Sequence, residues 1–282
     1  MRPICFGVLA RPGAVPGPLL RSRRPARAPA LALVLCAAVL GGAAGVASAQ
    51  DYEREKRWAA EVVPGLVVGD AVQIKTGRAE TAGREFLGLY TEAKNAKAAL
   101  VLVHGVGVHP DHGVIGILRT RLADLGYTTL SIQMPVQAKE AAVDDYYPKV
   151  FPDAADRMAR AAEWLRAKGQ TKLVLVSHSM GAWMANEYLD AQHAQTPYRA
   201  WVVMGLTGGY SWTMRRYKFP VLDVFGEKDL EPVMKAEGRR KGALDTGNGS
   251  RQVRIAGADH HYDKREAELA GAIDAFLRDV LK

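Results

Sequence analysis

The chain has 282 residues, 48% of them hydrophobic and 24% charged, a composition that predicts a globular protein with one or two domains. Its formal net charge of +8 is concentrated at the N-terminus, because six arginines and no acidic residue lie in residues 1–49. The remaining residues therefore carry a net charge of +2, which argues against a nucleic-acid-binding surface.

Residues 1–49 have the composition of an export signal. A basic stretch is followed by an apolar, alanine-rich run over residues 30–46 and then by Ala47-Ser48-Ala49. This order predicts a secretory signal peptide cleaved after Ala49, and hence a periplasmic or secreted protein. A membrane anchor is the alternative, but about 17 residues rich in glycine and alanine are short and weakly hydrophobic for a span. We expect no stable membrane span after cleavage.

The export route stays open. Ser22-Arg23-Arg24 resembles a twin-arginine signal, but Pro25-Ala26 follows where that signal has a hydrophobic pair. A lipid attached at Cys36 is disfavoured because Leu35 precedes it. Cys5 and Cys36 are the two cysteines of the sequence, and both lie in the segment expected to be removed. We therefore expect neither a disulfide nor a thiolate in the mature chain.

The first residues of the mature chain form a lead-in to the main domain. Residues 50–64 are highly charged around Trp58 and predict either a helix or a loose arm. Val67–Ile74 and Arg84–Tyr90 show partial alternation and predict an antiparallel hairpin at a sheet edge. We assign residues 50–83 to an N-terminal lead-in and edge strand, and residues 84–282 to the main domain.

From residue 98 onward, short apolar runs alternate with segments in which apolar residues recur at helical spacing. This alternation predicts a mostly parallel sheet with helices on both faces. The run Ala98–Val103 is continuously apolar, as in a strand covered on both sides. Only about fifteen residues, 205–219, separate two of the strands, so no large cap domain is expected. The expected strands are 98–103, 127–132, 173–176, 201–204, 221–225 and 253–255, and the expected helices are 117–125, 152–168, 182–192 and 266–281.

The central strand, 173–176, runs into Ser177-His178-Ser179-Met180-Gly181 and then into a helix. This strand–turn–helix context predicts a nucleophile elbow with Ser179 at its apex. Small residues are needed there because the backbones of strand and helix approach closely. Ser177 stands where the G-x-S-x-G pattern has its first glycine. An ordinary parallel strand that leads into an amphipathic helix is the alternative interpretation.

A serine nucleophile needs a base and an orienting acid, which in this fold type follow the serine in the order acid, then histidine. Asp229 lies just beyond a predicted strand, where ligand-facing loops of a parallel sheet gather, and is our candidate acid. Glu227 and Glu231 are less well placed alternatives. His260 lies just beyond the last predicted strand and is our candidate base, with His261 as its rival.

Backbone N–H groups are suited to stabilise an oxyanion, because they are fixed before the charge develops. Met180 offers one such group at a helix N-terminus. We expect the other from Val106, in the loop that follows the strand at 98–103. His104 is expected to hold that loop in place. His178 is expected to pack or hydrogen-bond without transferring a proton.

His109, Asp111 and His112 could suggest a metal site. Three ligand types within four loop residues, without a helical H-E-x-x-H, are a weak signal for a metal. We predict neither a metal nor a cofactor.

Together these segments resemble the α/β-hydrolase superfamily, and the resemblance covers about residues 84–282. It implies the α/β-hydrolase fold and hydrolysis of an ester or amide bond. Further segments resemble an uncharacterised, often exported bacterial family of this superfamily. The superfamily segments are 102–105, 177–181, 226–229 and 257–260, and the family segments are 109–111, 131–135 and 147–152.

The sequence therefore predicts an exported serine hydrolase that cleaves a small-molecule carboxylic ester or related acyl bond through an acyl-enzyme. Acyl transfer to an acceptor other than water would use the same residues. The loop at 134–148 and the segment Tyr210–Trp212 are expected to wall the pocket. A non-catalytic binding or envelope protein with the same fold is the alternative, because fold does not imply function.

Overall fold

The computed structural model describes residues 50–282, except residues 148 and 208–212. The predicted signal peptide and the expected pocket wall at Tyr210–Trp212 thus lie outside the described residues. Among the helices of the described part, none combines the length and the apolar character that crossing a bilayer requires.

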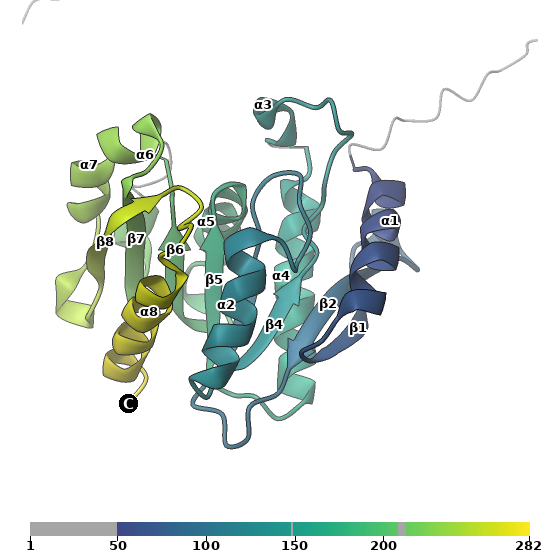
Figure 1. Ribbon diagram of the computed structural model, residues 1–282, viewed down its shortest axis with the longest axis horizontal. Coiled ribbons are helices and arrows are strands. Elements are labelled where there is room, and N and C mark those ends of the chain that lie inside the picture. The colour runs from purple at the N-terminus through teal and green to yellow at the C-terminus, as the bar shows by residue number, and fades with distance from the viewer. Residues whose placement is uncertain (1–49, 148, 208–212) are drawn as a thin grey trace, which may run out of the picture. The chain divides into compact units, whose positions relative to one another are not determined.

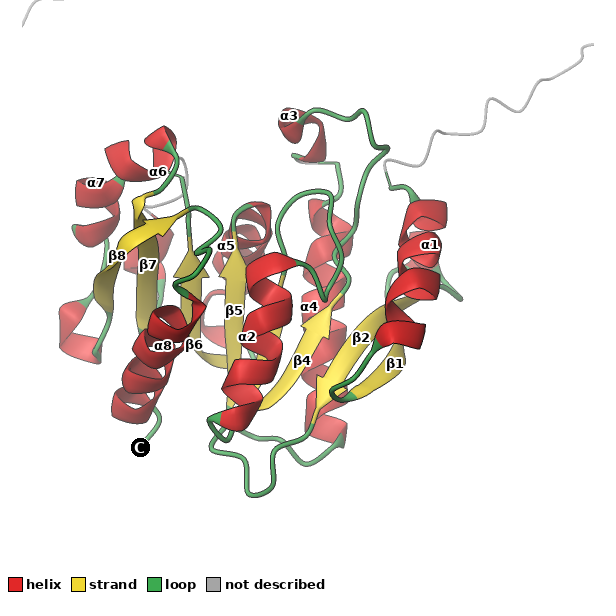
Figure 2. Cartoon of the chain, in the orientation of Figure 1, coloured by secondary structure: helices red, strands yellow, loops and turns green. Residues whose placement is uncertain are grey.

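Within the described residues, eight strands form one sheet in the order β1-β2-β4-β3-β5-β6-β7-β8 (Figure 2). β1 pairs antiparallel with β2, and β2 antiparallel with β4, which confirms the edge hairpin. All other neighbours are parallel. The strands are β1 (Asp70–Lys75), β2 (Glu85–Thr91), β3 (Ala99–Val103), β4 (Thr128–Ile132), β5 (Leu173–His178), β6 (Tyr198–Met204), β7 (Val221–Lys228) and β8 (Arg251–Asp259).

Helices cover both faces of this sheet. Figure 1 shows α2 and α8 on the near face and α4 and α5 on the far face, and the near face also carries α1 beside the hairpin. The helices are α1 (Tyr52–Val62), α2 (Gly113–Asp124), α3 (Val143–Tyr146), α4 (Phe151–Ala167), α5 (Met180–Gln192), α6 (Glu231–Lys235), α7 (Glu237–Lys241) and α8 (Glu266–Val280). Short 3-10 turns occupy Val63–Gly65, Ala79–Thr81, His193–Gln195, Thr213–Arg216 and Thr246–Asn248.

The central strand β5 shows why the sheet needs two helical layers. Every residue of β5 is buried. Val174 and Val176 point into the core formed with α2 and α8, whereas Leu173 and Leu175 point into the core formed with α4 and α5. A strand with both faces buried has a continuous run of apolar residues, which in β5 is 173–176.

The structure decides one open alternative of the prediction and moves several element boundaries. The charged N-terminal segment is a helix, α1, and the Asp51 side chain caps it by accepting the N–H of Arg54 at 2.9 Å. α2 begins at Gly113, four residues before the predicted start. In its first turn, Gly116 lies so close to the carbonyl of Asp111 that a side chain would clash there. β8 runs over Arg251–Asp259, longer than predicted, since as an edge strand it carries polar residues.

The connection between β6 and β7 consists of residues 205–220 and is too short for a cap domain.

Candidate active site

The turn between β5 and α5 consists of one residue, Ser179. Its φ of +55° lies in the left-handed region, which is strained for a residue with a side chain. Its N–H donates to the carbonyl of Met204 at 3.0 Å, so the strained turn is tied to β6. Two positions on, only glycine fits, because a Cβ at Gly181 would lie 2.3 Å from the carbonyl oxygen of His104. The strand–turn–helix geometry expected of a nucleophile elbow is present.

Ser177, the departure from the G-x-S-x-G pattern, has a local explanation. Its side chain is fully buried, and its hydroxyl accepts the indole N–H of Trp201 at 2.8 Å. A serine here satisfies a donor that would otherwise be buried without a partner. The substitution leaves the turn at Ser179 intact.

The three residues predicted to form a triad lie together. The Nε2 atom of His260 is 3.0 Å from the Oγ atom of Ser179, and its Nδ1 atom is 2.6 Å from Oδ1 of Asp229. Asp229 directly follows β7 and His260 directly follows β8. The side chains come from three strand ends and meet at one edge of the sheet, as the ends of parallel strands do.

Asp229, the acid of this hydrogen-bonded set of three residues, is held in its ionised form. Burial raises the pKa of Asp229, but the hydrogen bond from His260 and the N–H groups of Gly226 and Leu230 outweigh it and lower the pKa below its ordinary value. Since a carboxylate can only accept, Nδ1 of His260 carries the proton. Nε2 is then free to accept the Ser179 hydroxyl.

The rival residues lie outside this chain of hydrogen bonds. Glu227 accepts the N–H of Gly257 at 2.8 Å, and Glu231 forms an exposed ion pair with Lys235. His261 is exposed, with its ring centre 5.5 Å from that of His260.

The loop after β3 lies against Ser179, and His104 holds it there. A Cβ built on Gly105 would come within 3.3 Å of the Ser179 Cβ. His104 donates from Nδ1 to the Gly105 carbonyl at 2.8 Å and accepts the Met134 N–H at Nε2 at 2.9 Å. Burial lowers the pKa of His104 to about 3, so the ring is neutral and keeps both bonds. The expected role of His104 is confirmed.

Both expected oxyanion donors lie beside the serine. Met180 is the first residue of α5, at the positive end of the helix dipole. Val106 lines the same cavity as Ser179. That their N–H groups bind an oxyanion remains a prediction.

His178 supports the neighbouring base through the backbone. Its Nε2 atom is 2.8 Å from the carbonyl oxygen of His260, to which it donates. Burial, together with the nearby His260, lowers the pKa of His178 to about 3, so near neutral pH the ring is neutral and its one N–H proton is donated to that carbonyl. This position agrees with a hydrogen-bonding role.

Sequence reasoning missed the part that α1 plays at the site. The Arg54 guanidinium donates to the carbonyl of Gln137 at 2.9 Å and to that of Gly107 at 3.0 Å. It also stacks on Trp58, whose ring contacts His109 edge-on. α1 thus joins the loop after β3 to the loop after β4. The only signal in the sequence was a charged run around one tryptophan.

Sequence reasoning also missed Arg240, which is fully buried. Its Nε atom bonds both carboxylate oxygens of Asp223, and Nη1 donates to the carbonyls of Leu206 and Val233 at 2.8 and 2.7 Å. Leu206 adjoins Gly205, where a Cβ would lie only 2.8 Å from the His260 ring. Arg240 therefore fixes the wall against which the base packs.

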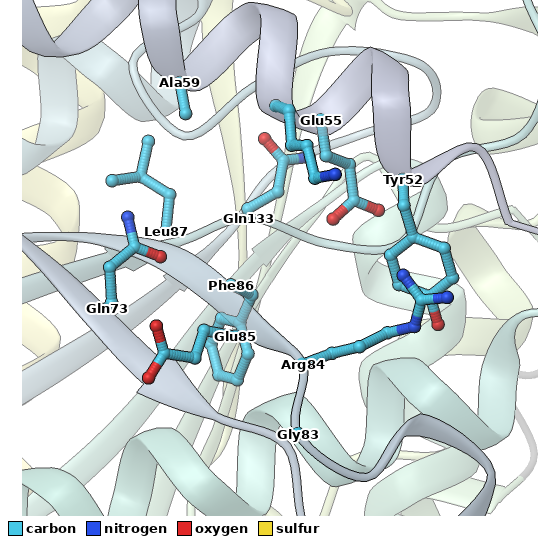
Figure 3. Close-up of a pocket in the computed structure, with 11 residues that line it drawn as sticks. Tyr52, Glu55, Ala59, Gln73, Gly83, Arg84, Glu85, Phe86, Leu87 and Gln133 are labelled. Carbon is cyan, nitrogen blue, oxygen red and sulfur yellow. The ribbon is translucent and has the colours of Figure 1, made fainter.

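A cavity of about 100 Å³ adjoins Ser179 and is lined by residues 104–106, 108, 112–115, 178–179 and 261. Residues 134–147, the described part of the loop expected to wall the pocket, supply none of this lining, and Gln137 instead accepts a bond from Arg54. A second cavity, of about 450 Å³, lies between α1 and the β1–β2 hairpin, with Tyr52 and Glu55 on one side and Phe86 on the other (Figure 3). Neither Ser179 nor His260 lines this second cavity.

The histidine-bearing loop considered for metal is held by other contacts. Asp111 accepts two bonds from Arg119, one of them at 2.8 Å, and His109 packs edge-on against His112. Among residues 50–282 as described, no three potential metal-ligating side chains gather in a group.

Comparison with known protein families gives a partial match. A family described as a protein of unknown function (DUF3530) matches residues 29–153, a range that ends before Ser179. No curated protein matches the chain.

Solved structures of α/β hydrolases resemble the chain at low sequence identity. A dienelactone hydrolase from Anabaena variabilis is 20% identical with a TM-score of 0.62, over 75% of this chain and 97% of that one. Est1E from Butyrivibrio proteoclasticus is 14% identical with a TM-score of 0.58, over 75% and 98%. An α/β serine hydrolase without a lid from Xanthomonas campestris is 17% identical with a TM-score of 0.56, over 76% and 95%. The chain has the α/β-hydrolase fold.

Proposed function

We propose that this protein is an exported serine hydrolase that cleaves a carboxylic ester or a related acyl bond through a Ser179–His260–Asp229 triad. The observation that carries the proposal is the unbroken hydrogen-bond chain from Asp229 through His260 to a serine at a strained turn. A nucleophile bonded to a base that is itself oriented by an acid is the arrangement that activates a hydroxyl.

In the reaction, the Oγ atom of Ser179 attacks the carbonyl carbon while Nε2 of His260 takes its proton. Asp229 keeps Nδ1 protonated and stabilises the imidazolium. The N–H groups of Val106 and Met180 stabilise the oxyanion. His260 then gives its proton to the departing alcohol, and a water molecule, deprotonated by His260, releases the acid and restores the serine.

Two further observations support parts of the proposal. Structures with this fold include proteins described as a dienelactone hydrolase and as a thermophilic esterase from Thermogutta terrifontis, which favours acyl-bond chemistry. Export rests on the signal-like composition of residues 1–49. Acyl transfer would use the same residues, and product analysis with an added alcohol separates transfer from hydrolysis.

The test is labelling of the chain from Gln50 onward with a fluorophosphonate, which reacts with activated serines. We expect stoichiometric labelling that is lost in folded Ser179→Ala and His260→Ala variants. Glu231→Ala is the matched control, since it removes an exposed carboxylate that lies outside the hydrogen-bond chain, and should label normally. Ester turnover should fall by roughly a millionfold in either triad variant, because the triad acts as a unit. Absence of labelling in folded wild-type protein would reject the hydrolase and favour a binding protein with this fold.

A further inference from the structure

We propose that the cavity beside Ser179 is the acyl pocket of this enzyme and that it accepts a short, apolar, unbranched acyl group of about two to four carbons. The inference rests on the proposed hydrolase function and adds the substrate class to it.

The lining of the cavity sets its chemistry. Val106 and Val108 come from the loop after β3, and Val114 and Ile115 from the first turn of α2. These aliphatic side chains offer no hydrogen bond, so an apolar group is favoured there over a polar one. The exposed residues of the lining include His112 and His261, which place the open side of the cavity near the solvent.

The position of the cavity identifies which part of an ester it holds. Ser179 and Val106 line it together, so a carbonyl carbon attacked by Ser179 with its oxygen directed to the Val106 N–H lies at the part of the cavity that these two residues form. The departing alcohol must reach Nε2 of His260 to receive its proton. His260 is not among the residues that line this cavity. The group in the cavity is therefore the acyl chain, and the alcohol lies on the His260 side.

The size of the cavity limits the length of that chain. A cavity of about 150 Å³ can hold benzene, which has six non-hydrogen atoms, so a volume of about 100 Å³ has room for about four. The end wall cannot readily retreat, because Ile115 is 1% exposed and belongs to the same core cluster as Leu102 and Val176. Each methylene beyond the available space should lower kcat/KM by about tenfold.

The experiment is a series of p-nitrophenyl esters from acetate to octanoate, which varies the acyl chain and keeps the alcohol constant. We expect the largest kcat/KM between acetate and butyrate, and a value for octanoate at least about tenfold lower. Equal or faster hydrolysis of octanoate would overturn the acyl-pocket inference.

Variants on α2 test the wall directly. Ile115→Ala and the milder Val114→Ala enlarge the cavity, and each should raise the hexanoate-to-acetate ratio of kcat/KM by about tenfold. Val114→Ala keeps the test valid if Ile115→Ala does not fold. Ile117→Ala is the matched control, since this side chain is on the same helix, is exposed and does not line the cavity. An unchanged ratio in folded Val114→Ala would also overturn the inference.

Fluorophosphonate labelling of the same preparations separates the two proposals. Protein that is labelled at Ser179 but prefers long acyl chains would refute the short acyl pocket and leave the hydrolase standing. Folded protein that is neither labelled nor active on any ester would refute both.

Discussion

The two flanks of Ser179 are held in different ways. On the acid–base flank, Asp229 and His260 follow the adjacent strands β7 and β8. A buried arginine from the short α7 helix donates to the carbonyl of Leu206, which adjoins the glycine that His260 packs against. On the oxyanion flank, the loop that carries Val106 is tied down by residues far away in the sequence. Arg54 in α1 reaches it across 53 residues, and also reaches the loop after β4 across 83.

Each flank contains one buried arginine–carboxylate pair, and the pairs differ in where the acid comes from. Arg240 and Asp223 are both fully buried, and Asp223 belongs to a strand inside the sheet. Arg157 pairs at 2.9 Å with Glu55, which is 8% exposed and belongs to α1. The first pair is built into the sheet. The second holds a surface helix in place, and through it the oxyanion loop.

The largest expected effect comes from breaking these pairs. Arg240→Met should lower the free energy of unfolding by about 3–5 kcal/mol, because it leaves the Asp223 carboxylate buried without its partner. Arg157→Met should lower the free energy of unfolding by less, since the Glu55 carboxylate can regain contact with water if α1 moves away from the sheet. Urea unfolding measures both, and Arg251→Met, which removes an arginine of an exposed ion pair, is the control. Equal losses would mean that α1 is held as firmly as β7.

The next effect concerns pH, and involves one histidine on each flank. The pKa values of His104 and His178 are lowered to about 3 in the folded protein, against 6.5 for the unfolded chain. Below pH 6.5 the unfolded chain therefore binds protons that the folded chain does not. The free energy of unfolding decreases as the pH is lowered from 6.5 to about 3. Each histidine should contribute a loss of about 2 kcal/mol between pH 6.5 and 5.

We would test this loss of stability by urea unfolding of wild type and His104→Gln at several pH values. Glutamine can keep both hydrogen bonds of His104 and cannot titrate, so the variant should lose about half of the acid sensitivity that the two histidines cause. His261→Gln, at an exposed position, should leave the acid sensitivity of the protein's stability unchanged. A variant at His104 as acid-sensitive as wild type would show that this ring is protonated in the folded state.

The smallest effect isolates α1 from overall stability. Arg54→Ala removes both of its carbonyl contacts and should lower kcat about tenfold with little change in KM, because the Val106 loop loses an anchor but keeps its His104 bonds. Lys56→Ala, on the same helix and in an exposed pair with Glu53, is the control. Unchanged ester turnover in folded Arg54→Ala would mean that His104 alone positions the loop.

The acid–base flank could be predicted from the sequence because its signals are local. Ser179, Asp229 and His260 each follow a short apolar run, and the ends of parallel strands converge at one sheet edge. The pattern alone left His261 as a rival. The structure separates the two, since His260 is buried between Asp229 and Ser179 and His261 is exposed.

By itself the sequence determined the order of strands and helices, the sheet class and the three residues that meet, because hydrophobic periodicity and turn chemistry act over a few residues. Only the tertiary structure decided that α1 docks on the oxyanion flank, that Arg240 binds the carbonyl of Leu206 and that Ser177 pairs with Trp201. These contacts join residues 24 to 102 positions apart, or depend on the close approach of two backbones. Local periodicity carries no information about such contacts, since their energy arises only when folding brings the partners together and removes water from them.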